Sequence, residues 1–217
     1  MWWEIAPAVR ADFEDWHAHE HFPERLALPG FRRGSRWSSS DGGDGVFVLY
    51  ELERHETLSS AEYLARLNAP TPWSVRLMPH HRAMVRSQCR VIASHGGAIA
   101  RHAMTVRFSP RDEAADALSA SLATLAASAA RRPGLFGAHL LRHEAPRIGA
   151  TREQALRSHA DGSADWVFLA IGCELDALHE LAESALAPEV LAQHGAGSGA
   201  IAGVYTLACS AVAAELA

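Results

Sequence analysis

Residues Phe13–Trp37 read FEDWHAHEHFPERLALPGFRRGSRW and combine the signals for a helix, a turn and a strand. Phe13 and Trp16 lie three residues apart among acidic and histidine side chains, which is the spacing of one helical face. Pro29-Gly30 predicts the end of that helix and a turn. Phe31–Ser38 then predicts a strand. A helix that leads through a Pro-Gly turn into a strand indicates a mixed α and β fold.

The segments on either side of this stretch extend the pattern. They predict strands at residues 2–9, 46–53 and 85–93, a helix from Asp12 to the Pro-Gly turn, and a second helix at 59–68. In the strand at 46–53, one face is apolar and the other is partly charged. Strand, helix, strand, strand, helix, strand is the order of the ferredoxin-like fold.

The second half of the chain predicts the same order again. Strands are expected at 102–108, 135–142, 166–173 and 201–209, and helices at 113–132 and 176–191. Pro133-Gly134 ends the first of these helices as Pro29-Gly30 ends its counterpart. A ferredoxin-like unit carries both helices on one side of its sheet, so two units gain by packing sheet to sheet. We therefore predict an α+β fold in which residues 1–97 and 98–217 are tandem ferredoxin-like repeats that form a pseudo-dimeric α/β barrel.

Composition narrows the class of partner. The chain has 217 residues, a formal net charge of -5 and no lysine, and its scattered arginines do not form the basic stripe of a nucleic-acid-binding protein. No apolar run reaches the roughly 18 residues of a membrane span, and the N-terminus lacks the pattern of a signal peptide. We expect a cytoplasmic protein that binds a small molecule, contacts neither nucleic acid nor membrane, and is a monomer, as a pseudo-dimer, or a higher homo-oligomer.

Motifs for bound cofactors are missing from the sequence. It contains no phosphate-binding glycine motif and no nucleophile elbow. Cys89, Cys173 and Cys209 lie in strand-like runs without the spacing of metal ligands, which indicates reduced thiols in the core. We therefore expect no cofactor.

Short motifs in residues 1–90 resemble a known superfamily. They are Trp16, Glu20-His21, Pro23-Glu24-Arg25-Leu26, Pro29-Gly30-Phe31, Glu62-Tyr63-Leu64 and Thr71-Pro72-Trp73-Ser74. With them the chain resembles uncharacterised bacterial proteins of the dimeric α/β-barrel superfamily and, more distantly, the EthD-like branch, in which a histidine followed by a proline recurs. The resemblance implies a ferredoxin-like barrel, and the superfamily includes cofactor-free monooxygenases, isomerases, haem enzymes and proteins without known activity. Residues 113–132 do not repeat the Glu-His-x-Pro-Glu-Arg pattern, so any site is expected in the first half.

Four polar residues of the first predicted helix fall at positions i, i+3, i+4 and i+7: His17, Glu20, His21 and Glu24. Two imidazoles and two carboxylates on one face form a workable ligand set for a divalent metal. The alternative is a solvated surface with local pairs of histidine and glutamate. The order of these residues does not match a zinc signature, so no metal site is predicted. His19 points away from this face and is expected to be exposed.

His21 is the predicted catalytic residue, and most of the support for this role comes from the resemblance. An imidazole with an ordinary pKa of about 6.5 exchanges protons near neutral pH, as a general base or acid must. Glu20 is the predicted catalytic partner, and Glu20 or Glu24 is expected to raise the pKa of His21 or to fix its tautomer. The alternative is that His21 anchors the helix end around Pro23.

Charged and aromatic residues of the first half are predicted to contact a substrate. These residues are Arg25, Arg32, Arg36, Tyr50 and Glu51. If those on strands point between the sheets, they form a polar patch opposite the uncharged strands of the second half, which is typical of a small-molecule pocket. The alternatives are solvent exposure for the strand charges and an ion pair within the turn for Arg25. Trp37 is a further lining candidate, whereas His80-His81 is assigned to a loop or a frayed helix and His139 and His143 to the surface or the barrel rim.

Three functions follow from these patterns together with the resemblance, which implies the oxygenase and haem classes. The first is an enzyme that acts on a small, partly apolar organic compound, with His21 as acid or base and an arginine as anion anchor. Its reaction is a proton abstraction, an isomerisation or a cofactor-free oxygenation. The second is a non-catalytic ligand-binding or interaction protein. The third is a haem protein with a histidine on the iron.

Overall fold

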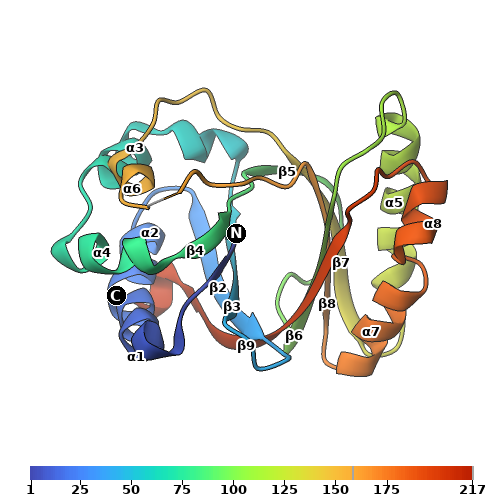
Figure 1. Cartoon of the computed structure of the whole chain (residues 1–217), viewed down its shortest axis with the longest axis horizontal. Helices are drawn as coiled ribbons and strands as arrows, with labels where there is room; N and C mark the ends of the chain where they lie inside the picture. The colour runs from blue at the N-terminus through green and yellow to red at the C-terminus, as the bar shows by residue number, and fades with distance from the viewer. Residues whose placement is uncertain (158, 217) are drawn as a thin grey trace.

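The computed structural model describes residues 1–157 and 159–216. These residues form one nine-stranded antiparallel sheet with helices at both ends of the molecule (Figure 1). The predicted α+β class is confirmed. The predicted second repeat, residues 98–217, includes Ser158 and Ala217, which lie outside the described residues. No helix in the described part of the chain is long and apolar enough to cross a membrane.

The first half contains most of the elements that the sequence predicts. They are β1 (Trp2–Glu4), α1 (Pro7–Trp16), a π-helical turn (His17–His21), α2 (Phe22–Leu26), β2 (Phe31–Ser39), β3 (Gly45–Leu52), α3 (Ala61–Asn68), α4 (Pro72–Leu77), β4 (Arg82–Val85) and β5 (Cys89–Gly96). Helix α3 is confirmed together with its serine cap, because the Ser60 hydroxyl accepts a hydrogen bond from the Tyr63 amide at 3.3 Å.

The second half contains all four strands that the sequence predicts. Its elements are β6 (His102–Phe108), α5 (Ala115–Ala129), β7 (Leu135–His143), α6 (Arg152–Ala155), β8 (Trp166–Gly172), α7 (Leu175–Glu183), α8 (Pro188–Gln193) and β9 (Ile201–Val212). The prediction of a single helix at 176–191 is wrong. The segment forms two helices, because Pro188 has no amide hydrogen to continue α7 and instead begins α8.

The strand order is β4-β1-β3-β2-β9-β6-β8-β7-β5. Strand β9 joins the two halves, because its first part pairs with β6 and its last part, Tyr205–Val212, pairs with β2. On the opposite side, β4 pairs with β1 while β5 pairs with β7 of the second half. The sheet therefore runs through both halves without a break at residue 97.

The inner faces of the sheet meet across a lumen. Trp2 on β1 donates a hydrogen bond through Nε1 to the Thr105 hydroxyl on β6 at 3.0 Å, although three strands separate β1 from β6 in the sheet order. Phe47 on β3 lies 5.4 Å from the Trp2 ring and 5.5 Å from the Tyr205 ring, measured between ring centroids. The helices cover the outer faces, with α1 to α4 and α6 at one end and α5, α7 and α8 at the other (Figure 1).

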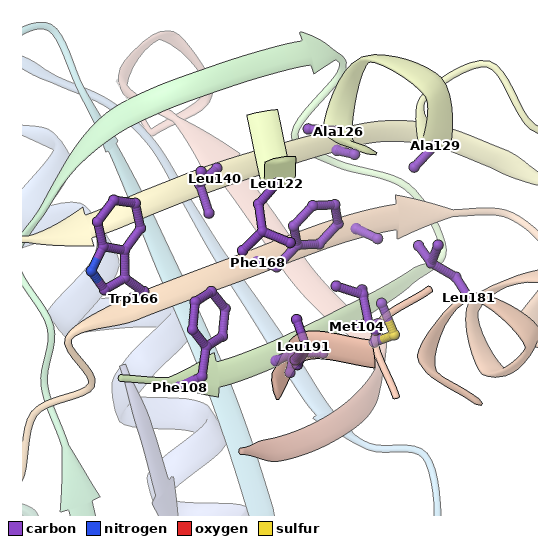
Figure 2. Close-up of a cluster of buried hydrophobic side chains, with 14 of the residues drawn as sticks. Met104, Phe108, Leu122, Ala126, Ala129, Leu140, Trp166, Phe168, Leu181 and Leu191 are labelled. Atoms are coloured by element: carbon purple, nitrogen blue, oxygen red, sulfur yellow. The ribbon is translucent and has the colours of Figure 1, made fainter. Parts of the chain in front are cut away.

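The outer face of the second half is filled by apolar side chains. Figure 2 shows Leu122, Leu140 and Phe168 pointing toward one another from α5, β7 and β8. Met104 on β6 and Leu181 on α7 belong to the same buried cluster. The outer face of the first half carries a more aromatic cluster that includes Trp3, Phe13, Trp16 and Phe22.

Two strand predictions of the first half are wrong in their bounds. The strand expected at 2–9 ends at Glu4, because Pro7 begins helix α1 and cannot donate to a sheet. The strand expected at 85–93 is divided into β4 and β5. At the break, the Ser87 hydroxyl bonds the backbone of Ala164 instead of a neighbouring strand.

Residues 144–165, the crossing segment, connect β7 to β8 by an unexpected route. The segment leaves β7, arches to the other half of the molecule and places α6 beside α3 (Figure 1). Helix α6 begins at a capping box in which Thr151 and Gln154 bond each other's backbone amides. Neighbouring antiparallel strands usually need a loop of about two to five residues, so this segment is far longer than the connection requires.

Candidate functional site

A cavity of about 600 Å³ extends from the helices that follow β1, on the outer face of the sheet, to strands β7 and β8 of the second half. Its polar wall is made by His17 and His21 from the π-helical turn, His81 after α4, and Tyr50 on β3. Leu58, Leu67 and Met78 add apolar surface. The volume falls within the range of about 300–1,000 Å³ that is usual for small-molecule pockets.

The π-helical turn puts two histidines on the cavity wall. Pro23 has no amide hydrogen and cannot bond the carbonyl of His19, so a regular α-helix is interrupted here. The chain widens instead, and the Phe22 amide bonds the carbonyl of His17. The His17 and His21 rings lie 5.4 Å apart between centroids, on the same side of the helix. Single π-helical turns of this kind are frequent at functional sites.

The three imidazoles are enclosed by aromatic rings. His17 is 1% exposed, His81 is 7% exposed and His21 is 8% exposed. The His81 ring lies 5.0 Å from the Trp3 ring, and the His21 ring lies 4.5 Å from the Trp16 ring.

Several buried polar atoms in this group are unpaired. Nδ1 of His17, Nδ1 of His21, both ring nitrogens of His81 and the Tyr50 hydroxyl have no hydrogen-bond partner among the residues that the structure describes. An unsatisfied buried polar atom costs about 1–3 kcal/mol, so a group of five calls for an explanation. Protein atoms enclose all five, so a ligand in the cavity reaches them only if neighbouring side chains move.

Burial controls the ionisation of these histidines. Desolvation lowers the pKa of all three imidazoles, and that of His81 falls to about 3. Charge adds to this effect, because Arg36 lowers the pKa of His17 and Arg25 lowers that of His21. The expectation that Glu20 or Glu24 raises the pKa of His21 is therefore wrong, although the Glu24 carboxylate lies 3.8 Å from Nδ1 of His21, and its effect on the tautomer stays a prediction. The imidazoles are neutral at pH 7, and each can accept a proton.

Four charged side chains form a network beside the histidines. The Arg25 guanidinium contacts Glu24 at 3.2 Å and forms a short ion pair with Glu153 of α6. Arg66 lies 3.0 Å from the other Glu24 oxygen. Desolvation raises the pKa of Glu24, and the two arginines oppose that shift. Arg25 is thus neutralised by two carboxylates, and its main contact ties the crossing segment to the helix.

The crossing segment supplies a second buried pair to the cavity. Arg157 lines the cavity and bonds Asp161 with both guanidinium branches, at 2.7 and 2.5 Å. The same region holds Arg86, whose guanidinium donates to the Tyr63 hydroxyl at 3.0 Å.

The structure places the predicted site residues in two groups. His21, Arg25, Arg32, Tyr50 and Glu51 line the cavity, with Arg32 exposed at its edge. Glu20 and Arg36 are not among the lining residues. The Glu20 carboxylate accepts hydrogen bonds from the Trp16 indole at 3.0 Å and from the Thr71 hydroxyl, which caps α4.

Arg36 lies one layer behind the cavity. Its guanidinium donates to the carbonyl of Glu14 at 3.3 Å and lies 5.4 Å over the Phe13 ring. Trp37, which the sequence suggested as a lining residue, is fully buried in the lumen and is not among the residues that line the cavity. His19 is exposed, as predicted, and pairs with Asp15 at 2.9 Å.

Sequence reasoning missed several lining residues. His81 was assigned to a loop and His139 to the surface or rim, yet both are buried and line the cavity. Glu153 and Arg157 reach it from a segment that was given no element. The capping box at Thr151 and the length of the crossing segment were the available signals, because long connections often carry functional residues.

The metal interpretation of the helix finds no geometric support. Within residues 1–157 and 159–216, no group of three or more histidine, cysteine, aspartate or glutamate side chains is arranged to hold a metal ion. The physical reason is that Glu20 turns toward Thr71 while Glu24 turns toward Arg25 and Arg66.

Comparisons with known proteins find similar folds among solved structures. No protein-family model and no curated protein matches the chain. Among solved structures, an anthrone oxidase-like protein is similar over 100% of this chain and 92% of its own, with a TM-score of 0.63 and 13% identity.

Two further structures are similar over nearly the whole chain. A candidate monooxygenase from Fusobacterium nucleatum has a TM-score of 0.60 and 6% identity, covering 96% of this chain and 90% of its own. A candidate monooxygenase from Lactobacillus acidophilus has a TM-score of 0.56 and 10% identity, covering 98% and 93%. At such low identity these likenesses show the fold alone.

Proposed function

We propose that this protein is an enzyme that oxygenates a small, partly apolar aromatic compound by histidine acid and base chemistry, without a cofactor. The observation that carries this proposal is the pair of buried, neutral imidazoles, His17 and His21, which line a largely apolar cavity with their ring centroids 5.4 Å apart. The names of the similar structures, anthrone oxidase-like and monooxygenase, support the same class of reaction.

The fold is proposed to be a pseudo-dimeric barrel. The strands β4-β1-β3-β2 and β9-β6-β8-β7 follow one another in the sheet, and each group has the order fourth, first, third, second of its own half. This order supports two tandem ferredoxin-like units packed sheet to sheet. The boundary between 97 and 98 and the distant EthD-like relationship stay predictions.

The chemical step begins with proton transfer to His21. A neutral imidazole at the cavity wall can take a proton from a carbon or hydroxyl that an adjacent aromatic ketone makes acidic. The resulting anion is electron-rich and reacts with dioxygen. For a methylene group the balance is CH2 + O2 → C=O + H2O, in which the carbon is oxidised and dioxygen is reduced.

The lowered pKa of His21 has two opposed effects on this step, because it keeps the imidazole unprotonated but also makes it a weaker base than free histidine. Burial keeps the imidazole unprotonated at pH 7, so it is ready to act as a base. After transfer, the imidazolium lies beside the substrate anion, and the attraction between them offsets the desolvation of each charge. His17, 5.4 Å away between ring centroids, is positioned to bond the substrate oxygen.

Oxygen uptake with anthrone tests the proposal. We expect the protein to accelerate conversion of anthrone to anthraquinone, with one dioxygen consumed per product. His21→Asn should lower the rate by about 10²–10⁴-fold, the usual contribution of a general base. His19→Asn, at the exposed histidine of the same turn, is the matched control and should keep the rate.

Two outcomes would contradict the oxygenase. The oxygenase proposal fails if the folded protein oxidises anthrone and related aryl ketones no faster than buffer alone does. A His21→Asn variant with full activity would remove His21 as the base. Tight binding of anthrone without oxygen uptake would support the alternative, a non-catalytic ligand-binding protein.

A further inference from the structure

The cavity contacts both faces of strand β3. Val48 and Tyr50 belong to the outer cluster that packs against the helices, whereas Phe47 and Leu49 belong to the lumen cluster. All four residues line the same cavity. Strand β1 pairs with β3 at residues 45–47, while β3 continues to Leu52. The cavity therefore extends from the histidines into the lumen beside the part of β3 that follows residue 47.

The lumen end of the cavity is walled by the second half. Leu141 on β7 and Val167 and Leu169 on β8 line it, opposite Trp2 and Leu49 of the first half. Leu49 and Leu141 are only partly buried, although their neighbours in the lumen cluster are closely packed. This pattern indicates open apolar space beside these two side chains.

The two ends of the cavity differ in hydrogen bonding. At the helix end, the His17, His21 and His81 rings carry buried nitrogens without described partners. At the lumen end, the Trp2 indole donates to Thr105 at 3.0 Å. His139 is also satisfied there, since one ring nitrogen lies 2.8 Å from the Ser94 hydroxyl and the other 3.0 Å from the carbonyl of Gly97.

We propose that the lumen end is a subsite for the apolar tail of an elongated ligand, whose phenol or aryl-ketone head binds the three histidines. The polar head contacts the imidazoles that line the helix end, and the tail needs no hydrogen bond. The ligand class is thus an alkyl- or aryl-substituted phenol or aryl ketone. This inference rests on the proposed function, because it places the reacting group at His21.

Anaerobic binding of 4-alkylphenols, from phenol to 4-hexylphenol, tests the subsite. Affinity is read from the fluorescence of the tryptophans that line the cavity, Trp2, Trp3 and Trp16. We expect each added methylene that enters the lumen end to tighten binding roughly fourfold, as about 0.8 kcal/mol per buried methylene implies. His21→Ala should weaken every member by a similar factor and leave this increment unchanged.

Filling the lumen end should abolish the increment. In Leu49→Trp and, as a second variant in case the first does not fold, Leu141→Trp, 4-hexylphenol is expected to bind less than threefold more tightly than phenol binds to the same variant. Ile201→Trp, at a side chain 54% exposed, is the control and should keep the full series. Near-ultraviolet circular dichroism verifies that each variant is folded.

The outcomes separate this inference from the proposed function. A flat series in the wild type, or an unchanged increment in a folded Leu49→Trp or Leu141→Trp variant, would overturn the tail subsite. Because dioxygen is absent, the result does not depend on turnover. Affinity that rises with the length of the alkyl chain, together with no oxygen uptake in the anthrone assay, would support the tail subsite and contradict only the oxygenase proposal.

Discussion

The two halves of the described chain differ on their helix sides, because apolar side chains fill the second half there and the first half lines a cavity. In the second half, Leu122, Leu140 and Phe168 fill the space between helix α5 and the sheet (Figure 2). In the first half, His17 and His21 face a cavity from the corresponding side of the sheet. The comparison shows that the backbone arrangement provides the place for a site, and that side-chain volume and polarity decide whether a site exists.

Removing a large side chain from the filled half should give the largest effect on stability. Phe168 is 0% exposed, and Phe168→Ala leaves a cavity that rigid neighbours cannot close. We expect a loss of about 3–5 kcal/mol in the free energy of unfolding, measured with urea. Phenol binding per folded molecule should be unchanged. A loss below about 1 kcal/mol would mean that the second half repacks easily and that the contrast between the halves is weak.

The hollow half needs support other than apolar packing, and the Arg25–Glu153 pair should provide part of it. Glu153→Ala removes one partner of a buried ion pair, so we expect a loss of about 3 kcal/mol in the free energy of unfolding. The double variant Arg25→Met, Glu153→Met leaves Glu24 paired with Arg66 and should recover most of that loss.

Hydrogen exchange locates the effect of Glu153→Ala. Faster exchange is expected in residues 144–165, because the variant loses the contact that ties the crossing segment to the helix. Unchanged stability in Glu153→Ala would show that this pair does not hold the cavity wall.

Buried histidines should make the hollow half sensitive to acid. The pKa of His81 is about 3 in the folded protein and about 6.5 when unfolded, so between these values the unfolded state binds the extra proton. Stability is therefore lost as the pH falls below about 6.5, by up to about 1.4 kcal/mol per pH unit for this residue.

The variant His81→Phe isolates that contribution. Between pH 5.5 and 4.5, its loss of unfolding free energy per pH unit should be smaller than that of the wild type by about 1.4 kcal/mol. His19→Phe is the matched exposed control. Equal slopes in His81→Phe and wild type would mean that His81 is protonated in the folded protein over this range.

Local signals predicted much of the fold, whereas long-range contacts set most of the site. The Ser60 cap and the Pro29-Gly30 turn are encoded by neighbours in sequence, and the structure confirms the elements that they delimit. The pairing of β5 with β7 depends on residues far apart in sequence and left no local pattern. Glu153 and Arg25 are 128 positions apart in the sequence, so the periodicity of the sequence could not predict their contact.

The helical residues illustrate the same limit at shorter range. A regular helix puts Glu20 and His21, at i+3 and i+4, on one broad face with His17, as the sequence pattern predicts. The wider turn imposed before Pro23 keeps His17 and His21 together and directs Glu20 toward Thr71. Pro23 was visible in the sequence, but its effect depends on which carbonyls find other partners.

The smallest expected effect concerns a single hydroxyl. The Tyr50 hydroxyl is buried, has no described partner, and burial raises the pKa of the phenol well above its ordinary value. Tyr50→Phe should leave the free energy of unfolding unchanged or raise it by up to about 1 kcal/mol, because an unpaired polar atom leaves the interior. Tyr63→Phe is the matched control. It removes the acceptor of the Arg86 bond and should cost about 1 kcal/mol. If Tyr50→Phe instead lowers the free energy of unfolding as much as Tyr63→Phe does, an ordered water satisfies the hydroxyl, and the cavity is less in need of a ligand than its unpaired atoms indicate.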